Sequence, residues 1–218
     1  MKKFAWSFSA LTRYENCPKQ YWHLNVAKDF KDADSSFSED GKIIHDALYK
    51  RVIKNVPLPM ELRPLEQVAA KFASTPGEKK GEMKLALNRD MEPVDFFAHD
   101  AWVRAVVDLL VVKGNKAVIV DWKTGKPKDD FTQLGLTAAV VAQWVPEVDT
   151  FTTAYVWTSH RKVTHKVYTK DDLASVWNDM LPRSKKVEHA IAHTEFPAKS
   201  SGLCGYCPVS SCPHFNPR

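Results

Sequence analysis

The sequence has no apolar run long enough to cross a bilayer. The longest, Ala105–Val112, contains Asp108 and is far shorter than the roughly 20 residues that a spanning helix requires. The N-terminus has the charges of a signal peptide, but Arg13, Glu15 and Lys19 follow where its apolar segment would lie. These absences lead us to expect a cytoplasmic protein with no membrane span and no signal peptide.

Glycine is scarce, and the phosphate-binding loop of P-loop ATPases is missing. The chain has 8 glycines in 218 residues. The segment Lys123-Thr124-Gly125-Lys126 contains residues typical of that loop, but no glycine-rich stretch precedes its lysine. We also find no internal repeat, no low-complexity linker and no motif that reads base edges. These absences exclude a P-loop ATPase and favour contact with any nucleic acid through its backbone and shape.

The residues that are present fit one globular domain. Apolar residues make up 44% of the chain and charged residues 26%, the balance of a folded soluble protein. The 31 Lys and Arg exceed the 26 Asp and Glu, so the formal net charge is +5, which permits a polyanionic partner without requiring one. We expect a single domain over 1–218, with a helical part in 1–80, a sheet core in 81–170 and a C-terminal helix with a cysteine segment in 171–218.

Apolar spacing predicts helices on both sides of a group of strands. The expected helices are a short N-terminal one, capped by Ser9 and broken at Pro18, and the segments 39–54, 61–72, 131–143 and 169–193. Ser38 and the pair Thr169 and Asp172 are the expected caps of two of these, and Pro182 should kink or split the last. The expected strands are 83–87, 102–112, 117–123, 150–157 and 162–168, the first three as a meander.

Two neighbouring strands carry acidic side chains. Because side chains alternate along a strand, Asp121 and Lys123 project from one face while Trp122 packs on the other. Asp108 interrupts an apolar run on the preceding strand, where a buried carboxylate needs a cation. The two carboxylates could supply oxygen ligands for Mg²⁺ or Mn²⁺, with Lys123 orienting or polarising a metal-bound water. A structural ion pair between Lys123 and either carboxylate is the alternative interpretation.

Cysteine is confined to the two ends of the chain. Cys17 lies near the N-terminus, and Cys204, Cys207 and Cys212 lie near the C-terminus. In a reducing compartment such a set favours metal ligation over disulfides, so the two ends are expected to meet. Four thiolates can hold either a Zn²⁺ ion or an iron–sulfur cluster, and their spacing does not decide between the two. His214 is a minor alternative ligand.

An ordered set of motifs runs along almost the whole chain. In order, they are Ser7-x-Ser9-x-Leu11-x2-Tyr14-x2-Cys17-Pro18, Gly41-x3-His45, Asp108, Asp121-x-Lys123-Thr124-Gly125 and Gln133-Leu134. The set resembles the PD-(D/E)xK nuclease superfamily. Within it, the set is similar to the RecB-like branch, which includes CRISPR-associated exonucleases with an iron–sulfur cluster and related viral nucleases. The resemblance implies a restriction-endonuclease-like α/β core, in which helices flank a mixed central sheet and cysteines clasp a terminal subdomain.

The resemblance also implies a metal site. His45, Asp108 and Asp121 would be its ligands, with the Trp122 carbonyl as a further one. Without the resemblance, His45 would be interpreted as an ordinary helix histidine. Glu82 stands where some relatives carry an acidic residue, and we give it less weight because a glutamate at the start of a strand is common.

Further roles follow from the same resemblance. Lys123 would be the catalytic lysine, and Gln133 would face the site from a helix. Thr137 departs from the branch, which often has a tyrosine four residues after this glutamine. The split set of Cys17, Cys204, Cys207 and Cys212 shifts the preferred cofactor from zinc to a [4Fe–4S] cluster.

The implied function is a Mg²⁺- or Mn²⁺-dependent DNA nuclease, preferably a single-strand exonuclease. A helicase or recombination protein could act with it. Trp6, Tyr14, Tyr21 and Trp22 could stack bases, but their helical spacing fits the protein core better. Two alternatives stay open: a non-catalytic DNA-binding or adaptor protein on the same scaffold, and a zinc-clasped nuclease.

Overall fold

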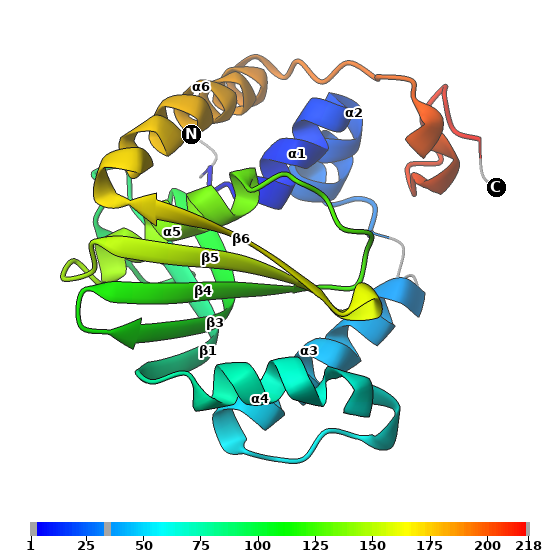
Figure 1. Ribbon diagram of the computed structural model, residues 1–218. Helices are drawn as coiled ribbons and strands as arrows, with labels where there is room; N and C mark the ends of the chain where they lie inside the picture. The colour runs from blue at the N-terminus through cyan, green and yellow to red at the C-terminus, as the bar shows by residue number, and fades with distance from the viewer. Residues whose placement is uncertain (1–3, 33–35, 217–218) are drawn as a thin grey trace. The chain divides into compact units, whose positions relative to one another are not determined.

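The computed structural model describes residues 4–32 and 36–216, with the backbone alone described in 36–38. The chain folds into two compact units. Residues 36–178 form one, called here the sheet unit, and residues 1–35 with 179–218 form the other, called the terminal unit. Figure 1 shows the elements of each. In the described ranges, no helix is long and apolar enough to span a bilayer.

The sheet unit is built on a six-stranded mixed sheet. Its order is β2-β1-β3-β4-β5-β6, and every neighbouring pair is antiparallel except β4 and β5. Helix α5 (Thr132–Trp144) connects these two parallel strands, as a parallel crossover requires. The expected α/β core with a mixed central sheet is confirmed. The strands are β1 (Glu78–Leu87), β2 (Pro93–Val94), β3 (Val103–Lys113), β4 (Lys116–Lys123), β5 (Thr150–Trp157) and β6 (Lys162–Thr169).

Helices cover both faces of the sheet. On one face, α3 (Ser36–Lys54) and α4 (Glu66–Ser74), which a 3₁₀ turn at Met60–Leu65 precedes, share an apolar cluster with β3, β4 and β5. Phe72 on α4 and Trp122 on β4 meet edge-on there, at 5.6 Å between ring centroids. Burying a side chain of this size contributes about 1.5–3 kcal/mol. Asp121 and Lys123, the neighbours of Trp122 along β4, point to the other face, where both contact Gln133 on α5.

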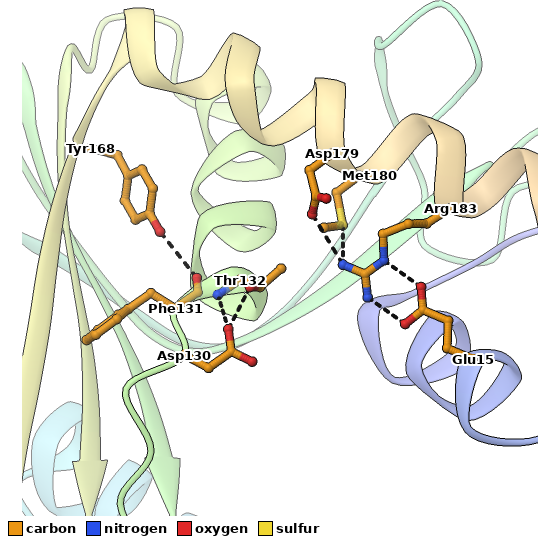
Figure 2. Close-up of polar contacts among 8 residues, drawn as sticks. All are labelled: Glu15, Asp130, Phe131, Thr132, Tyr168, Asp179, Met180 and Arg183. Atoms are coloured by element: carbon orange, nitrogen blue, oxygen red, sulfur yellow. Dashed lines mark hydrogen bonds and ion pairs between the residues drawn. The ribbon is translucent and has the colours of Figure 1, made fainter.

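Helix α5 is buried around most of its circumference, since every residue from 134 to 142 is buried. One close approach depends on glycine at position 135, because a Cβ there would lie 3.1 Å from the Tyr168 hydroxyl oxygen. Tyr168 donates from that hydroxyl to the Phe131 carbonyl at 3.2 Å (Figure 2). The start of α5, and with it Gln133, is thereby tied to strand β6.

The terminal unit joins the two ends of the chain. The Arg183 guanidinium donates to both carboxylate oxygens of Glu15 on α1, at 2.6 and 2.8 Å (Figure 2). A bidentate pair of this kind is stronger than an ordinary surface ion pair. The elements of the unit are α1 (Phe8–Asn16), α2 (Pro18–Tyr21), a π-helical turn (Trp22–Ala27), the second half of α6 (Lys170–His193) and a 3₁₀ turn (Gly202–Tyr206).

Two helix starts differ from the expected ones. The cap of α1 is Ser7 and not Ser9, because the helix begins directly after Ser7, whose hydroxyl accepts the Ala10 N–H at 3.3 Å. Ser38 does not cap α3, which begins two residues before it, and its side chain lies outside the described part. The predicted cap at Thr169 is present, since its backbone N–H donates to the Asp172 carboxylate at 2.7 Å.

The predicted breaks and strands also need correction. Pro18 does separate α1 from α2, but Pro182 does not split α6, which is one helix of 24 residues. Proline removes a single backbone hydrogen bond, and the Arg183–Asp179 contact at 3.3 Å bridges the same turn. Strand β1 begins at Glu78, earlier than expected, and β2 was not predicted because two residues are too short to show an alternation.

Candidate active site

Strands β3 and β4 part where their carboxylates lie. Backbone pairing between the two strands ends at Leu109 opposite Val120. Asp108 and Asp121 occupy the next position on each strand. The Trp122 N–H donates to the Asp108 carboxylate at 2.8 Å, so this side chain accepts a hydrogen bond that strand pairing would otherwise use. Asp121 lies close enough to Asp108 for the charge of Asp108 to raise the pKa of Asp121. The point where the two strands part is called here the opening.

Glu82 on β1 joins this opening through its backbone conformation. Its φ of 52° lies in the left-handed region, which costs a non-glycine residue about 1 kcal/mol or more. The pairing of β1 with β3 skips this position and continues on either side. As a result, a Glu82 carboxylate oxygen lies within 4.8 Å of ligand atoms of both His45 and Asp108. The sequence could not show this, because no pattern of residue types indicates the unusual φ.

His45 reaches the opening from α3. Its Nε2 lies 2.8 Å from the Trp122 carbonyl oxygen, and its Nδ1 lies 3.4 Å from an Asp108 carboxylate oxygen. Burial alone would lower the pKa of His45, but the Asp108 carboxylate and the Trp122 carbonyl raise that pKa above its ordinary value. A cation that displaced the proton would meet an imidazole nitrogen and a carbonyl oxygen already side by side.

Asp121, Lys123 and Gln133 form a triangle of polar contacts. The Lys123 ammonium lies 3.0 Å from an Asp121 oxygen and donates to the Gln133 side-chain oxygen at 3.2 Å. Gln133 in turn donates from Nε2 to Asp121 at 3.0 Å. The buried Thr137 hydroxyl donates to the Gln133 backbone carbonyl at 3.0 Å, so it is engaged within α5.

The carboxylates of the opening lack sufficient positive charge. Burial raises the pKa of Asp121 to about 6, although the Lys123 ammonium opposes the rise and Asp108 adds to it. Burial also raises the pKa of Glu82, again with a contribution from Asp108. Lys123 pairs with Asp121, and Lys84 and His45 lower the pKa of Glu82 in part, but the pKa values of both carboxyl groups stay raised, so these cations do not offset the burial. Carboxylate oxygens with one imidazole are a donor set that Mn²⁺ or Mg²⁺ accepts, and the residues therefore fit a divalent cation.

The opening forms part of a cleft of about 820 Å³. Its lining comes from α3, from Glu82 on β1 and from residues 122–125 at the end of β4. Gly41 lies in this lining, one helical turn before His45, and a Cβ at position 41 would meet no atom within 4 Å. Packing therefore does not explain a glycine in the interior of α3. The glycine leaves this part of the cleft open.

The four cysteines line one pocket within the terminal unit. Cys17 lies between α1 and α2, while Cys204, Cys207 and Cys212 lie in and after the last 3₁₀ turn. All four thiols are free. Burial raises the pKa of Cys207, and each of the other three sulfurs raises it further. His214 lines the same pocket, so the alternative ligand is also nearby.

The aromatic residues near the N-terminus are used for packing. Trp6 and Tyr21 are buried, and Tyr14 meets Tyr21 edge-on at 5.7 Å between ring centroids. The Trp22 ring packs against Phe196 at 4.7 Å. These side chains form part of the core of the terminal unit, as their spacing suggests.

Comparisons with known proteins agree with this geometry. The family described as the PD-(D/E)XK nuclease superfamily matches residues 5–213. The crystal structure of SSO0001 has a TM-score of 0.50 and 13% identity, covering 99% of this chain and 89% of that one. A protein from Eubacterium rectale named "Putative exonuclease" has a TM-score of 0.55 and 14% identity, covering 94% and 87%. No curated protein matches the chain, and at these identities the structural likeness shows the fold alone.

Proposed function

We propose that this chain, which belongs to the PD-(D/E)XK nuclease superfamily, is a metal-dependent exonuclease that acts on single-stranded DNA. One observation carries the proposal: ligand atoms of His45, Glu82 and Asp108 lie within 4.8 Å of one another, beside a cleft that His45, Glu82 and Lys123 line. Asp121 lies 3.0 Å from the Lys123 ammonium. Phosphodiester hydrolysis needs positive charge at the phosphate and an activated water beside it. This set of residues can provide both.

The residues of the chain divide this chemistry between them. A bound Mg²⁺ or Mn²⁺ supplies a Lewis acid and lowers the pKa of water. Lys123 lines the cleft, where its ammonium can donate to the attacking water and offset charge on the phosphate. Gln133 contacts both Asp121 and Lys123, and so holds the ammonium in place. The residues that we propose as ligands of the cation are His45, Glu82, Asp108 and Asp121, with the Trp122 carbonyl; the first three bring ligand atoms within 4.8 Å of one another.

The exonuclease part of the proposal has a direct test. Linear single strands labelled at the 5′ or 3′ end, a closed circle of the same sequence and a duplex are incubated with the protein and Mn²⁺. An exonuclease degrades the linear strand and leaves the circle intact, and the two labels report the polarity. Cutting of the circle at the rate of the linear strand would show an endonuclease.

Two replacements of Gly41 should have different effects, one on the stability of the protein and the other on its activity. Gly41→Ala removes a helix-interior glycine, so the free energy of unfolding should rise by about 0.5–1 kcal/mol. Gly41→Leu should remain folded and lower DNA cleavage by about 10- to 100-fold, because its side chain enters the cleft and displaces the substrate. Thermal unfolding and cleavage kinetics measure the two effects. A Leu variant with unchanged cleavage would show that the substrate does not approach this helix.

The proposal includes a [4Fe–4S] cluster in the terminal unit. Four free thiols line one pocket, and backbone N–H groups of Lys199 and Ser201 contact the Cys17 and Cys204 sulfurs at 3.5 and 3.4 Å. The division of the set into Cys17 and three cysteines near the C-terminus is the one that the resemblance links to a [4Fe–4S] cluster, and four thiolates are the ligand set of such a cluster.

Protein purified without oxygen should therefore be coloured and contain about four iron atoms per chain. Cys207→Ser should lose most of the iron and lower the melting temperature, because ligation stabilises the segment that holds the last three cysteines. His214→Ala is the matched control and should keep its iron. A colourless protein that contains zinc and no iron would overturn this part of the proposal.

A further inference from the structure

Two phenylalanines lie on the loop that follows β2. The rings of Phe96 and Phe97 meet edge-on at 5.1 Å between centroids. Phe97 is 74% exposed, the highest exposed fraction of any large apolar side chain in the described ranges. Phe96 is half-buried, so Phe97 is the member of the pair that presents an aromatic face to solvent.

The loop fixes Phe97 at its backbone. Asp95 Oδ1 accepts the Phe97 N–H at 2.8 Å, and the Asp95 carbonyl accepts the Ala98 N–H at 2.9 Å. This Asx turn fixes the backbone that carries the Phe97 ring. It also engages one oxygen of the Asp95 carboxylate in a hydrogen bond. The ring is therefore presented to solvent by a defined turn.

Two cations flank the rings. Lys84 Nζ lies 5.8 Å from the centre of the Phe97 ring, and the Arg104 guanidinium carbon lies 5.3 Å from that of Phe96. The register of β1 and β3 puts both cations on the same side of this strand pair. The Lys84 ammonium lowers the pKa of Glu82, and Arg104 Nε is buried without a hydrogen-bond partner. The Arg104 guanidinium therefore has a donor that an anion could use.

Lys84, Phe96, Phe97 and Arg104, called here the basic aromatic patch, begin close to the candidate metal ligands. Lys84 follows Glu82 by two positions on β1, a rise of about 6.6 Å. A polymer that leaves the cleft along β1 therefore meets Lys84 first and the Phe97 ring next. The exposed ring can stack on the face of an unpaired base, and the cations can contact the negatively charged phosphate backbone.

We propose that the basic aromatic patch binds the DNA strand beside the scissile phosphate, with one unpaired base stacked on Phe97. This inference rests on the proposed function, since it extends the substrate path from the same cleft. Lys84 and Arg104 contact the phosphates on either side of the stacked base. A duplex keeps its bases stacked on one another and offers no free face to Phe97, so the patch selects single strands.

The test is binding of a fluorescent thymidine oligonucleotide by the full chain, measured by anisotropy with chelator present so that no cleavage occurs. Phe97→Ala and Phe97→Leu should each weaken binding about tenfold, while Phe97→Trp retains it because the indole keeps an aromatic face. Met60→Ala removes another highly exposed apolar side chain of the sheet unit and should change nothing. Lys84→Glu should weaken binding and reduce its salt dependence, whereas Lys113→Glu should do neither.

The outcomes separate this inference from the proposed function. If the unaltered protein neither binds nor cleaves single strands, the proposed function fails. If it does both and Phe97→Ala binds equally well, the inference alone is overturned. Full binding by Phe97→Leu would also overturn it, because leucine keeps apolar contact without an aromatic face. Equal weakening of duplex and single-strand binding by Phe97→Ala would contradict the selection of single strands.

Discussion

Lys123→Met should lower the rate of DNA cleavage by about 10²- to 10⁴-fold while the protein stays folded. The ammonium is the cation that the chain itself places beside Asp121, at 3.0 Å, and Gln133 holds it there. Methionine keeps most of the side-chain length and apolar volume but has no charge and no proton to donate. The loss should therefore appear in the maximal rate at saturating DNA.

Two companion variants make the result specific. Lys113→Met carries the same substitution at an exposed position at the end of β3 and should cleave DNA at the normal rate. Lys123→Arg keeps the charge but changes its shape, so it should recover only part of the activity. Normal cleavage by Lys123→Met would assign Lys123 to a structural ion pair and remove it from the mechanism.

Asp121→Asn should abolish cleavage, with a loss of at least about 10³-fold, because it removes a carboxylate from the candidate metal site. The amide is the same size and can still accept from Gln133, so the fold should be retained. Binding of Mn²⁺, followed by calorimetry, should weaken in parallel. A variant that loses cleavage but binds Mn²⁺ normally would show that Asp121 is not a ligand.

The same substitution should stabilise the metal-free protein. Because burial raises the pKa of Asp121 to about 6, the folded state holds a proton that the unfolded state releases near pH 4. This contribution to stability is complete below about pH 4 and is lost as the pH rises through about 6. In chelator at pH 7.5, Asp121→Asn should raise the free energy of unfolding by on the order of 2–3 kcal/mol.

Denaturant unfolding at several pH values measures this effect. The difference between Asp121→Asn and the unaltered protein should grow from pH 4 to pH 6 and then level off. Added Mn²⁺ should reverse the order of stability, since only the carboxylate gains from the cation. A difference that shrinks with rising pH would contradict the raised pKa.

The parts of the site that lie on regular strands were predictable from sequence. Alternation along β4 places Asp121 and Lys123 on one face of the strand. Asp108 is conspicuous because a charged side chain within an apolar strand is costly to bury unless it is paired. The predicted meander of β1, β3 and β4 is confirmed, whereas the parallel pairing of β4 with β5 was not predicted. The assignment of His45 and Gln133 to the site depends on the family resemblance. Hydrophobic periodicity predicts helices and strands, but it does not predict which residues far apart in the sequence are in contact.

The rest depends on local backbone geometry. Glu82 enters the site through a left-handed φ of 52°, which no spacing of residue types reveals. Ser7 caps α1 in place of Ser9 because the helix begins two residues earlier than its apolar residues suggest. Phe97 was not singled out, because its loop contains several carboxylates and the flanking cations come from β1 and β3 through their register.

The most direct measurement compares the unaltered protein with Asp121→Asn, purified side by side, on end-labelled linear single-stranded DNA. The account predicts degradation by the unaltered protein with Mn²⁺ or Mg²⁺, none in chelator, recovery when the cation is restored and no degradation by the variant under any of these conditions. Degradation that persists in chelator, or that Asp121→Asn performs at the normal rate, would contradict it.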